Sequence, residues 1–214
     1  MALSEGCKTR NQGMGGLPVD ARRLIDFLRV AERLKDVPRH CWTTGGRRES
    51  VAEHSWRVAL MAMLMADEFP ELDIDRVIQM CLVHDLGEAV TGDIPTFVKT
   101  DADRVVEGRE VDALIGALPE PWPEWLGALF AEMEALETPE ARLYKALDRM
   151  EAIQSHNESA VETWLPLEYD LNLTYGEKDA AFSPYLTALR AEMRRDTEAM
   201  IEDARARGIV KTED

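Results

Sequence analysis

The amino-acid sequence predicts an all-α fold, a single bundle of helices. Apolar residues recur at three- and four-residue steps along most of the chain, which is the spacing of one helix face. We find no strand-like alternation of useful length and no internal repeat. The length of 214 residues favours one domain, whose core removes roughly 70% of the unfolded surface from water. We place this domain at residues 18–210 and expect the glycine-rich, polar residues 1–17 to form a disordered tail.

The expected helices, in chain order, span residues 19–34, 52–69, 74–86, 101–118, 124–136, 139–157 and 183–207. The first is amphipathic, with Leu24, Phe27 and Leu28 on one face. The second is apolar on nearly every side, which is typical of a helix in the centre of a bundle. Asp73 is a suitable N-cap for the third, and Ser183-Pro184 begins the last with a cap and a first-turn proline. Proline and glycine break the pattern between the helices.

Composition restricts the partners and the compartment. The chain has 41 acidic and 25 basic residues and a formal charge of −16, which repels nucleic-acid backbones and anionic membranes. No apolar run approaches the ~20 residues that span a bilayer, and the N-terminal residues contain no hydrophobic signal core. The three cysteines form no CxxC pair, which indicates free thiols in a reducing compartment. We therefore expect a cytoplasmic protein that binds small molecules, with no extended nucleic acid and no membrane as partner.

Two histidines and two aspartates are candidate ligands of one metal ion. His54 lies in the second expected helix, His84 and Asp85 end the third, and Asp148 lies in the sixth. Each shares a helix face with apolar residues, so all four side chains are expected to point inward. Burying unpaired charges there would cost several kcal/mol each, and a shared divalent cation removes that cost. The sequence therefore predicts a metal centre between three helices.

The mixed ligand set indicates a transition ion. Imidazole and carboxylate together suit Mn²⁺, Co²⁺, Fe²⁺, Ni²⁺ or Zn²⁺ better than Mg²⁺ or Ca²⁺. Four protein ligands on an octahedral ion would leave two positions for water and a substrate oxygen. The alternative is structural, because a single buried histidine is more often a hydrogen-bonded core residue than a ligand. Asp148 favours the metal, since aspartate is unfavourable inside a helix, and the combination of all four residues favours it further.

Two motifs around these residues resemble those of a known family. Residues 49–55 read ESVAEHS and contain the first histidine, and residues 83–96 read VHDLGEAVTGDIPT and contain the adjacent pair. These motifs are similar to those of the HD-domain phosphohydrolases and, more narrowly, of the 5′-deoxynucleotidase branch. The similarity runs from about Leu24 to Asn157 and includes residues 143–148, which read LYKALD.

The resemblance implies a single HD-domain bundle that removes the 5′-phosphate from (deoxy)nucleoside monophosphates with the help of a metal. The implied roles are metal ligation by His54, His84, Asp85 and Asp148 and catalysis by Glu88 and Asp93. Two-metal members carry extra histidines between the HD pair and the last aspartate. This chain has none there, because its other histidines are His40 and His156. We therefore expect one divalent metal per chain.

On the substrate side, the resemblance implies that Arg39 orients the phosphate, since a planar guanidinium matches phosphate oxygens. It also implies that Ile94, Pro95 and Thr96 form a loop in contact with the nucleotide. His40 departs from the family pattern. The better-known bacterial members carry a tryptophan at this position, and that tryptophan is associated with a preference for deoxyribose. Trp42 stands two residues later, as in relatives with a longer loop, and either covers the sugar or base or fills the core. We therefore expect only a moderate preference for 2′-deoxy substrates.

Other functions remain open. One alternative is a different HD reaction, by a phosphodiesterase or a nucleotide (tri)phosphohydrolase, although the short chain and the lack of basic clusters argue against polyphosphates. Another is a non-catalytic metal-binding regulatory domain, against which the retention of Glu88 and Asp93 argues. The resemblance also implies a homodimer. The segment from Trp122 to Trp125 is compatible with an interface and equally with core packing.

Overall fold

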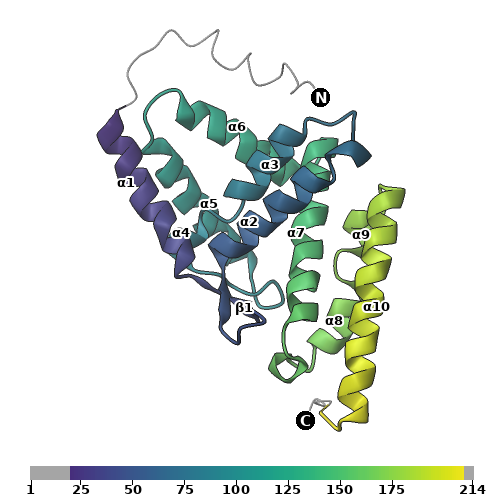
Figure 1. Cartoon of the computed structure of the whole chain (residues 1–214). Coiled ribbons are helices and arrows are strands. Elements are labelled where there is room, and N and C mark those ends of the chain that lie inside the picture. Colours follow the sequence, from purple (N-terminus) through teal and green to yellow (C-terminus); the bar gives the residue numbers. More distant parts are fainter. Residues whose placement is uncertain (1–19, 210–214) are drawn as a thin grey trace.

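The computed structural model describes residues 20–209 and has the all-α architecture that the sequence predicts (Figure 1). Its helices are α1 Ala21–Ala31, α2 Val51–Leu64, α3 Ile74–Val83, α4 Glu88–Thr91, α5 Asp101–Gly116, α6 Trp122–Ala135, α7 Pro139–Glu158, α8 Glu168–Thr174, α9 Glu177–Ala180 and α10 Pro184–Ala206. Short 3₁₀ helices span Glu32–Lys35 (η2), Ala66–Glu68 (η3) and Val161–Thr163 (η4). The expected tail over residues 1–17 lies outside the described residues. No helix in the described part of the chain is both long and apolar enough to cross a bilayer.

Side-chain caps set the helix starts, as expected. The Asp73 carboxylate accepts a hydrogen bond from the backbone N–H of Arg76 at 3.1 Å, and α3 begins at the next residue. The Ser183 hydroxyl accepts one from the N–H of Leu186, with Pro184 in the first turn of α10. Such caps satisfy donors that the helix itself leaves unpaired.

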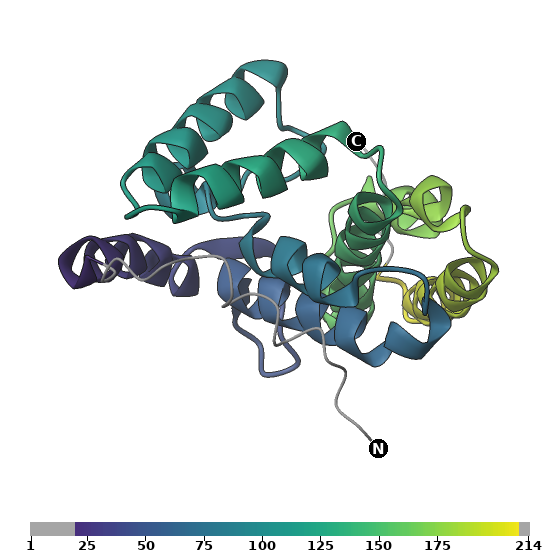
Figure 2. The same ribbon diagram turned by 90° about the horizontal axis from the view of Figure 1, so that it is seen from above.

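Helix α7 is the centre of the bundle. Helices α2 and α3 pack on it from one side, and α9 and α10 pack on it from the other, where α8 in turn lies against α10 (Figures 1 and 2). The α5 and α6 pair runs side by side in a separate layer, with α6 touching α3 and α7 (Figure 2). Leu143, Leu147 and Met150 of α7 are fully buried. This packing places polar residues of α2, α3 and α7 next to one another inside the bundle.

The segment expected as a loop over residues 35–50 contains a small antiparallel hairpin. Strand β1 (Pro38–Trp42) pairs with β2 (Arg48–Ser50), so Pro38 faces Ser50 and Trp42 faces Arg48. These strands are too short and too polar to show an alternating pattern. Because β1 also packs on α7, the hairpin carries Arg39 to the middle of the bundle.

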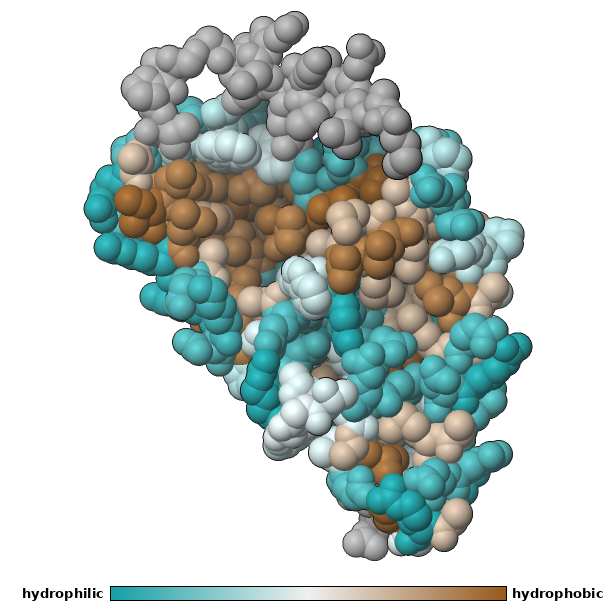
Figure 3. All heavy atoms as spheres, viewed as in Figure 1, coloured by the Kyte–Doolittle hydropathy of each residue, from teal (hydrophilic) through white to brown (hydrophobic). Residues whose placement is uncertain are grey.

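Helix α2 is not buried on every side, which corrects the expectation from its composition. Its inner face carries the fully buried Val58 and Ala62, whereas Trp56 is 61% exposed and Leu64 is 72% exposed. Helices α3 and α7 cover only the inner face of α2. Figure 3 shows an apolar area on the side of the molecule where α1, α2 and α3 lie. Exposed apolar side chains of these helices are Ile25, Leu28, Trp56, Met63, Leu64 and Leu82, here called the apolar face.

The third helix ends three residues earlier than expected, and α4 follows as a separate turn. Gly87 stands at this break and lies against α5. A Cβ at this position would come within 2.8 Å of Cγ2 of Val111 and 2.9 Å of Cγ of Glu107. Glycine therefore allows α4 to approach α5 closely, and this approach fixes where Glu88 begins its own helix. The segment between α7 and α10, for which we expected a loop, contains two further helices, α8 and α9.

Candidate active site

The four expected metal ligands come together at one point. Nε2 of His54 lies 3.1 Å from Oδ1 of Asp148 and 3.2 Å from Nε2 of His84. Oδ2 of Asp85 lies 3.1 Å from Nε2 of His84 and 3.7 Å from Nε2 of His54. The chain thus presents two imidazole nitrogens and two carboxylate oxygens toward one another from three helix segments. Their convergence matches the expectation from the sequence.

Both histidines have their other ring nitrogen tied to an acceptor. Nδ1 of His84 lies 2.9 Å from the backbone oxygen of Cys81, and Nδ1 of His54 is hydrogen-bonded to the carboxylate of Glu151. A carbonyl and a carboxylate can only accept, so each Nδ1 carries the hydrogen and donates it. In the neutral form of each ring Nε2 then carries the lone pair, so it is the atom that would bind a metal ion at the shared centre.

The electrostatics of this centre favour a cation. Burial opposes a charge on His84, yet its pKa is raised well above the usual value because the carboxylates of Asp85 and Asp148 lie beside it. Burial likewise opposes ionisation of Asp148, but Lys145 and the two imidazoles lower its pKa well below the usual range. The Lys145 ammonium donates to Oδ2 of Asp148 at 2.7 Å. The donor set and its negative charge therefore fit a divalent metal ion, which His54, His84, Asp85 and Asp148 could hold.

Glu88 and Asp93 line the same pocket. Glu88 is 5% exposed, and Nζ of Lys99 lies 3.9 Å from its Oε1. Burial, followed by the charges of Asp85 and Asp93, raises the pKa of Glu88 to about 9. Burial also raises the pKa of Asp93. Lys99 is engaged by Glu107, with which it forms a close ion pair. Two buried acids with raised pKa values thus lie beside the four converging residues.

We expect the metal-free protein to lose stability as pH rises from 4.5 to about 9, the interval between the ordinary and raised pKa of Glu88. In this interval the folded chain holds a proton at Glu88 that the unfolded chain has released, so the free energy of unfolding falls as pH rises. Melting temperatures of chelator-treated protein between about pH 5 and pH 8 should fall by about 5 °C or more.

The matched variant for this pH dependence is Glu88→Gln. It removes the titrating proton and should flatten the profile, leaving a smaller slope of the same sign from Asp93 and, above pH 6.5, from His84, whose pKa is also raised. An equally steep profile in Glu88→Gln would assign the pH dependence to other groups.

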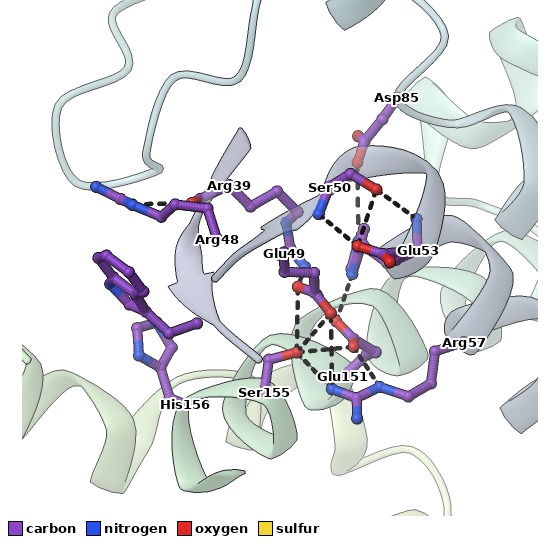
Figure 4. A network of polar contacts seen from close by, with 12 residues as sticks. Arg39, Arg48, Glu49, Ser50, Glu53, Arg57, Asp85, Glu151, Ser155 and His156 are labelled. Carbon is purple, nitrogen blue, oxygen red and sulfur yellow. Dashed lines mark hydrogen bonds and ion pairs between the residues drawn. The ribbon is translucent and has the colours of Figure 1, made fainter. Parts of the chain in front are cut away.

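Arg39 reaches the pocket from β1 and is held by buried carboxylates (Figure 4). Its Nη1 lies 2.8 Å from Oε2 of Glu49 and 3.2 Å from Oε2 of Glu151. Glu151, which is fully buried, also accepts from Nε of Arg57 at 2.6 Å and from the Ser155 hydroxyl at 2.9 Å.

Glu151 is a residue of this site that the sequence analysis did not identify. The sequence does contain a signal for it, because Glu151 follows Asp148 by three residues and so lies on the same face of a helix whose neighbouring residues are largely buried and apolar.

The pocket has a volume of about 220 Å³ and receives most of the expected substrate residues. Arg39, His40, Ile94, Pro95 and Thr96 line it together with Glu88 and Asp93. Trp42 is the exception, because it is not among the lining residues. Its ring lies 5.2 Å from the guanidinium carbon of Arg48. Lys99 and Lys145 also line the pocket.

Sequence reasoning missed the far wall of the pocket, which α8 and the end of α7 form. The residues concerned are His156, Glu168, Leu171, Asn172 and Tyr175. Nε2 of His40 lies 3.2 Å from Oε1 of Glu168, and Nε2 of His156 lies 3.6 Å from the same oxygen. The two remaining histidines therefore turn toward Glu168. Because α8 was expected as loop, no periodic signal pointed to this wall.

Comparisons with known proteins agree with this geometry. The HD domain family model matches residues 31–190. The chain is 35% identical to the Homo sapiens protein named 5′-deoxynucleotidase HDDC2 over 142 residues, covering 64% of this chain and 69% of that protein. Identity with its Bos taurus counterpart of the same name is 36% over 142 residues, covering 64% and 68%.

Among solved structures, the chain is similar to one described as a predicted metal-dependent phosphohydrolase from Magnetospirillum magnetotacticum MS-1. The TM-score is 0.69 at 31% identity, covering 89% of this chain and 95% of that one. These matches confirm the family resemblance of the motifs and the all-α fold.

Proposed function

Because this chain belongs to the HD-domain family, we propose that it is a metal-dependent phosphomonoesterase that removes the 5′-phosphate from (deoxy)nucleoside monophosphates. The observation that carries this proposal is the convergence of His54, His84, Asp85 and Asp148 beside two buried acids in one pocket. The relatives named 5′-deoxynucleotidase supply the substrate class.

A single divalent transition ion is the proposed cofactor. The four converging side chains would hold it, and when bound it supplies positive charge that neutralises the phosphate oxygens. A second group of possible donors, Glu49, His54 and Glu151, lies nearby. Arg39 and Arg57 already balance these two glutamates, so this group needs no metal. One ion per chain is therefore our proposal.

The chain's own residues perform the proton transfers. We assign Glu88 to remove a proton from the attacking water, whose oxygen forms the new bond to phosphorus. In the metal-free chain burial and the charges of Asp85 and Asp93 keep Glu88 protonated near neutral pH. A divalent cation bound beside Asp85 would lower this pKa and leave the carboxylate able to accept the proton. The P–O5′ bond breaks, and the leaving 5′-oxygen takes a proton from Asp93. The pKa of Asp93 is raised by burial, and this favours the protonated form that the role requires. The products are a nucleoside and inorganic phosphate.

Arg39 is the proposed phosphate-orienting group. Its side chain is 13% exposed, and its guanidinium is held in place by Glu49 and Glu151. A guanidinium fixed in advance loses little freedom when it binds a phosphate oxygen. The overall negative charge of the chain makes such a local positive group necessary for an anionic substrate.

Phosphate release from a nucleotide panel tests this function. The panel holds 5′-monophosphates, 5′-triphosphates and cyclic monophosphates, each with chelated enzyme and with enzyme supplied with Mn²⁺, Co²⁺, Fe²⁺, Ni²⁺ or Zn²⁺. We expect metal-stimulated release from the 5′-monophosphates. Preference for triphosphates or cyclic substrates would indicate another HD reaction, and metal binding without turnover would indicate a regulatory domain.

Deoxy selectivity is expected to be moderate, with kcat/KM for dAMP somewhat above that for AMP. His40 lines the pocket and is smaller than an indole, so it excludes a 2′-hydroxyl less strictly by shape. A hydrogen bond between the 2′-hydroxyl and the His40 imidazole would stabilise the ribo substrate by about 0.5–1.5 kcal/mol and so offset part of the preference for the deoxy substrate. The measurement is kcat/KM for matched deoxy and ribo pairs, with His40→Trp expected to increase the preference.

Trp42→Ala is the matched control for the selectivity measurement. A strong deoxy preference in the unmutated enzyme that survives His40→Trp and disappears in Trp42→Ala would assign selectivity to Trp42.

We also propose a homodimer formed through the apolar face. Helix α1 is amphipathic, yet none of its residues is buried in the single chain. Covering exposed side chains such as Leu28 and Trp56 would remove apolar surface from water.

The segment from Trp122 to Trp125 is divided between the two uses considered for it, because Trp125 packs on the core whereas Trp122 is 37% exposed. The test of the dimer is its mass in solution. Light scattering should give twice the mass of 24.1 kDa, and Trp56→Glu should shift the protein toward the monomer.

A further inference from the structure

Glu151 is a fully buried carboxylate that touches two parts of the active site at once. It accepts a hydrogen bond from Nδ1 of His54 and lies 3.2 Å from Nη1 of Arg39. Both partners have a role in the proposed function, one as metal ligand and one as phosphate-orienting group. A buried carboxylate is costly unless it is paired, so its position calls for an explanation.

Helix α7 holds both sides of the His54 ring. Oδ1 of Asp148 lies 3.1 Å from Nε2, and Glu151, three residues later, binds Nδ1. Residues three apart lie on the same face of a helix, so one helix provides both acids. The ring therefore has one orientation relative to α7, with its Nε2 directed to the centre where His84 and Asp85 meet it.

Two arginines keep the same carboxylate charged and in place. Arg57 donates from Nε to Oε1 of Glu151 at 2.6 Å, and Arg39 approaches Oε2 (Figure 4). Nδ1 of His54 is hydrogen-bonded to the same Oε2. Glu49 provides a comparison within the same network. It pairs with Arg39 at 2.8 Å and its Oε1 lies 3.1 Å from Oγ of Ser155, but the structure gives it no hydrogen bond to His54. The two glutamates thus share arginine contacts and differ at the histidine.

We propose that Glu151 is a positioning residue that orients the metal ligand His54 and, through the same carboxylate, places Arg39 against the phosphate subsite. This proposal rests on the proposed function for the role of Arg39, whereas its metal part concerns binding alone. A carboxylate on the far nitrogen of a ligating histidine fixes its tautomer and raises its basicity, and loss of such a partner costs about 10–100-fold in metal affinity or activity. Because Arg39 is paired with the same carboxylate, the position of the phosphate that Arg39 binds also depends on Glu151.

The test compares Glu151→Gln with Glu49→Gln in the full chain. Both variants remove one negative charge from the Arg39 network, but only the first changes the partner of His54. Zn²⁺ affinity is measured by competition with a chelator, without substrate. We expect the dissociation constant to rise about 10–100-fold in Glu151→Gln and to change little in Glu49→Gln. The KM for a monophosphate should rise in both variants, because each loses a carboxylate that holds Arg39.

Two outcomes would overturn the proposal. Unchanged Zn²⁺ affinity in Glu151→Gln would show that His54 needs no carboxylate partner. An equal loss in both variants would assign the effect to the charge of the network rather than to contact with His54. If the unmutated chain binds Zn²⁺ as expected but hydrolyses no nucleotide, the proposed function fails while the metal part of this proposal stands.

A spectroscopic measurement covers the case in which Glu151→Gln does not fold. The chain has four histidines, so NMR spectra of histidine labelled with ¹⁵N are simple enough to assign. In the Zn²⁺-loaded unmutated protein, a proton on Nδ1 of His54 should resonate at low field, as a charge-assisted hydrogen bond requires. It should keep its position in Glu49→Gln and move upfield in Glu151→Asp, whose shorter side chain reaches less far. Absence of this proton in the unmutated protein would refute the assigned contact.

Discussion

Replacing Glu88 by alanine should leave the metal in place and lower kcat by about 10²–10⁴-fold, the usual contribution of a general base. Glu88 begins α4 and is not one of the four converging ligand residues, so its loss removes an acid–base group and no ligand. The measurements are kcat with a 5′-monophosphate and metal content by elemental analysis of the same sample.

Glu107→Gln is a suitable control for the Glu88 variant. Glu107 is the other carboxylate paired with Lys99, and it lies on α5. Its replacement should alter the surroundings of Glu88 with a much smaller effect on kcat. A near-normal rate in Glu88→Ala would mean that another group deprotonates the water. Loss of metal in that variant would make Glu88 a ligand.

Replacing Asp148 by alanine should abolish metal binding and with it turnover. The side chain contributes one of two carboxylates at the centre and contacts both histidines, at 3.1 Å and 3.5 Å. Its removal also leaves Lys145 unpaired beside the site, where a cation repels the metal. Elemental analysis after reconstitution should fall from about one equivalent per chain to nearly none, since metal affinity depends on ligand number and charge.

The matched control for Asp148→Ala is Asp179→Asn. Asp179 pairs with Arg149, the residue after Asp148, and is therefore a carboxylate near α7 that the ligand cluster does not include. This variant should retain one equivalent of metal. A bound equivalent in Asp148→Ala would remove Asp148 from the ligand set, and two equivalents in the unmutated protein would refute the mononuclear proposal.

The sequence predicted the helices well wherever local signals were strong. The caps at Asp73 and Ser183 and the periodic apolar residues of α7 led to boundaries close to those observed. The errors fell on segments whose structure depends on neighbours. The hairpin over residues 38–50 is held by pairing and by contact with α7, and the break at Gly87 follows from its approach to α5. Neither contact leaves a periodic pattern in the chain.

The four converging residues were predictable because polar residues on apolar helix faces are rare and costly. His54, His84, Asp85 and Asp148 each stood out for this reason, and the motifs around them matched a family. The same reasoning failed for α2 as a whole, because an apolar composition does not say which faces are covered. Trp56 is exposed on the side that no described helix covers.

The sequence by itself determined the fold class, the family and the four residues that meet at the centre, because each depends on side-chain chemistry and helical spacing. Only the tertiary structure decided that Glu151 lies under His54, that Arg39 shares its carboxylate and that Trp42 does not line the pocket. Glu151 and Arg39 are 112 residues apart in the chain. Helical periodicity reports the face on which a side chain lies, whereas the partner it meets across the core depends on how the helices pack.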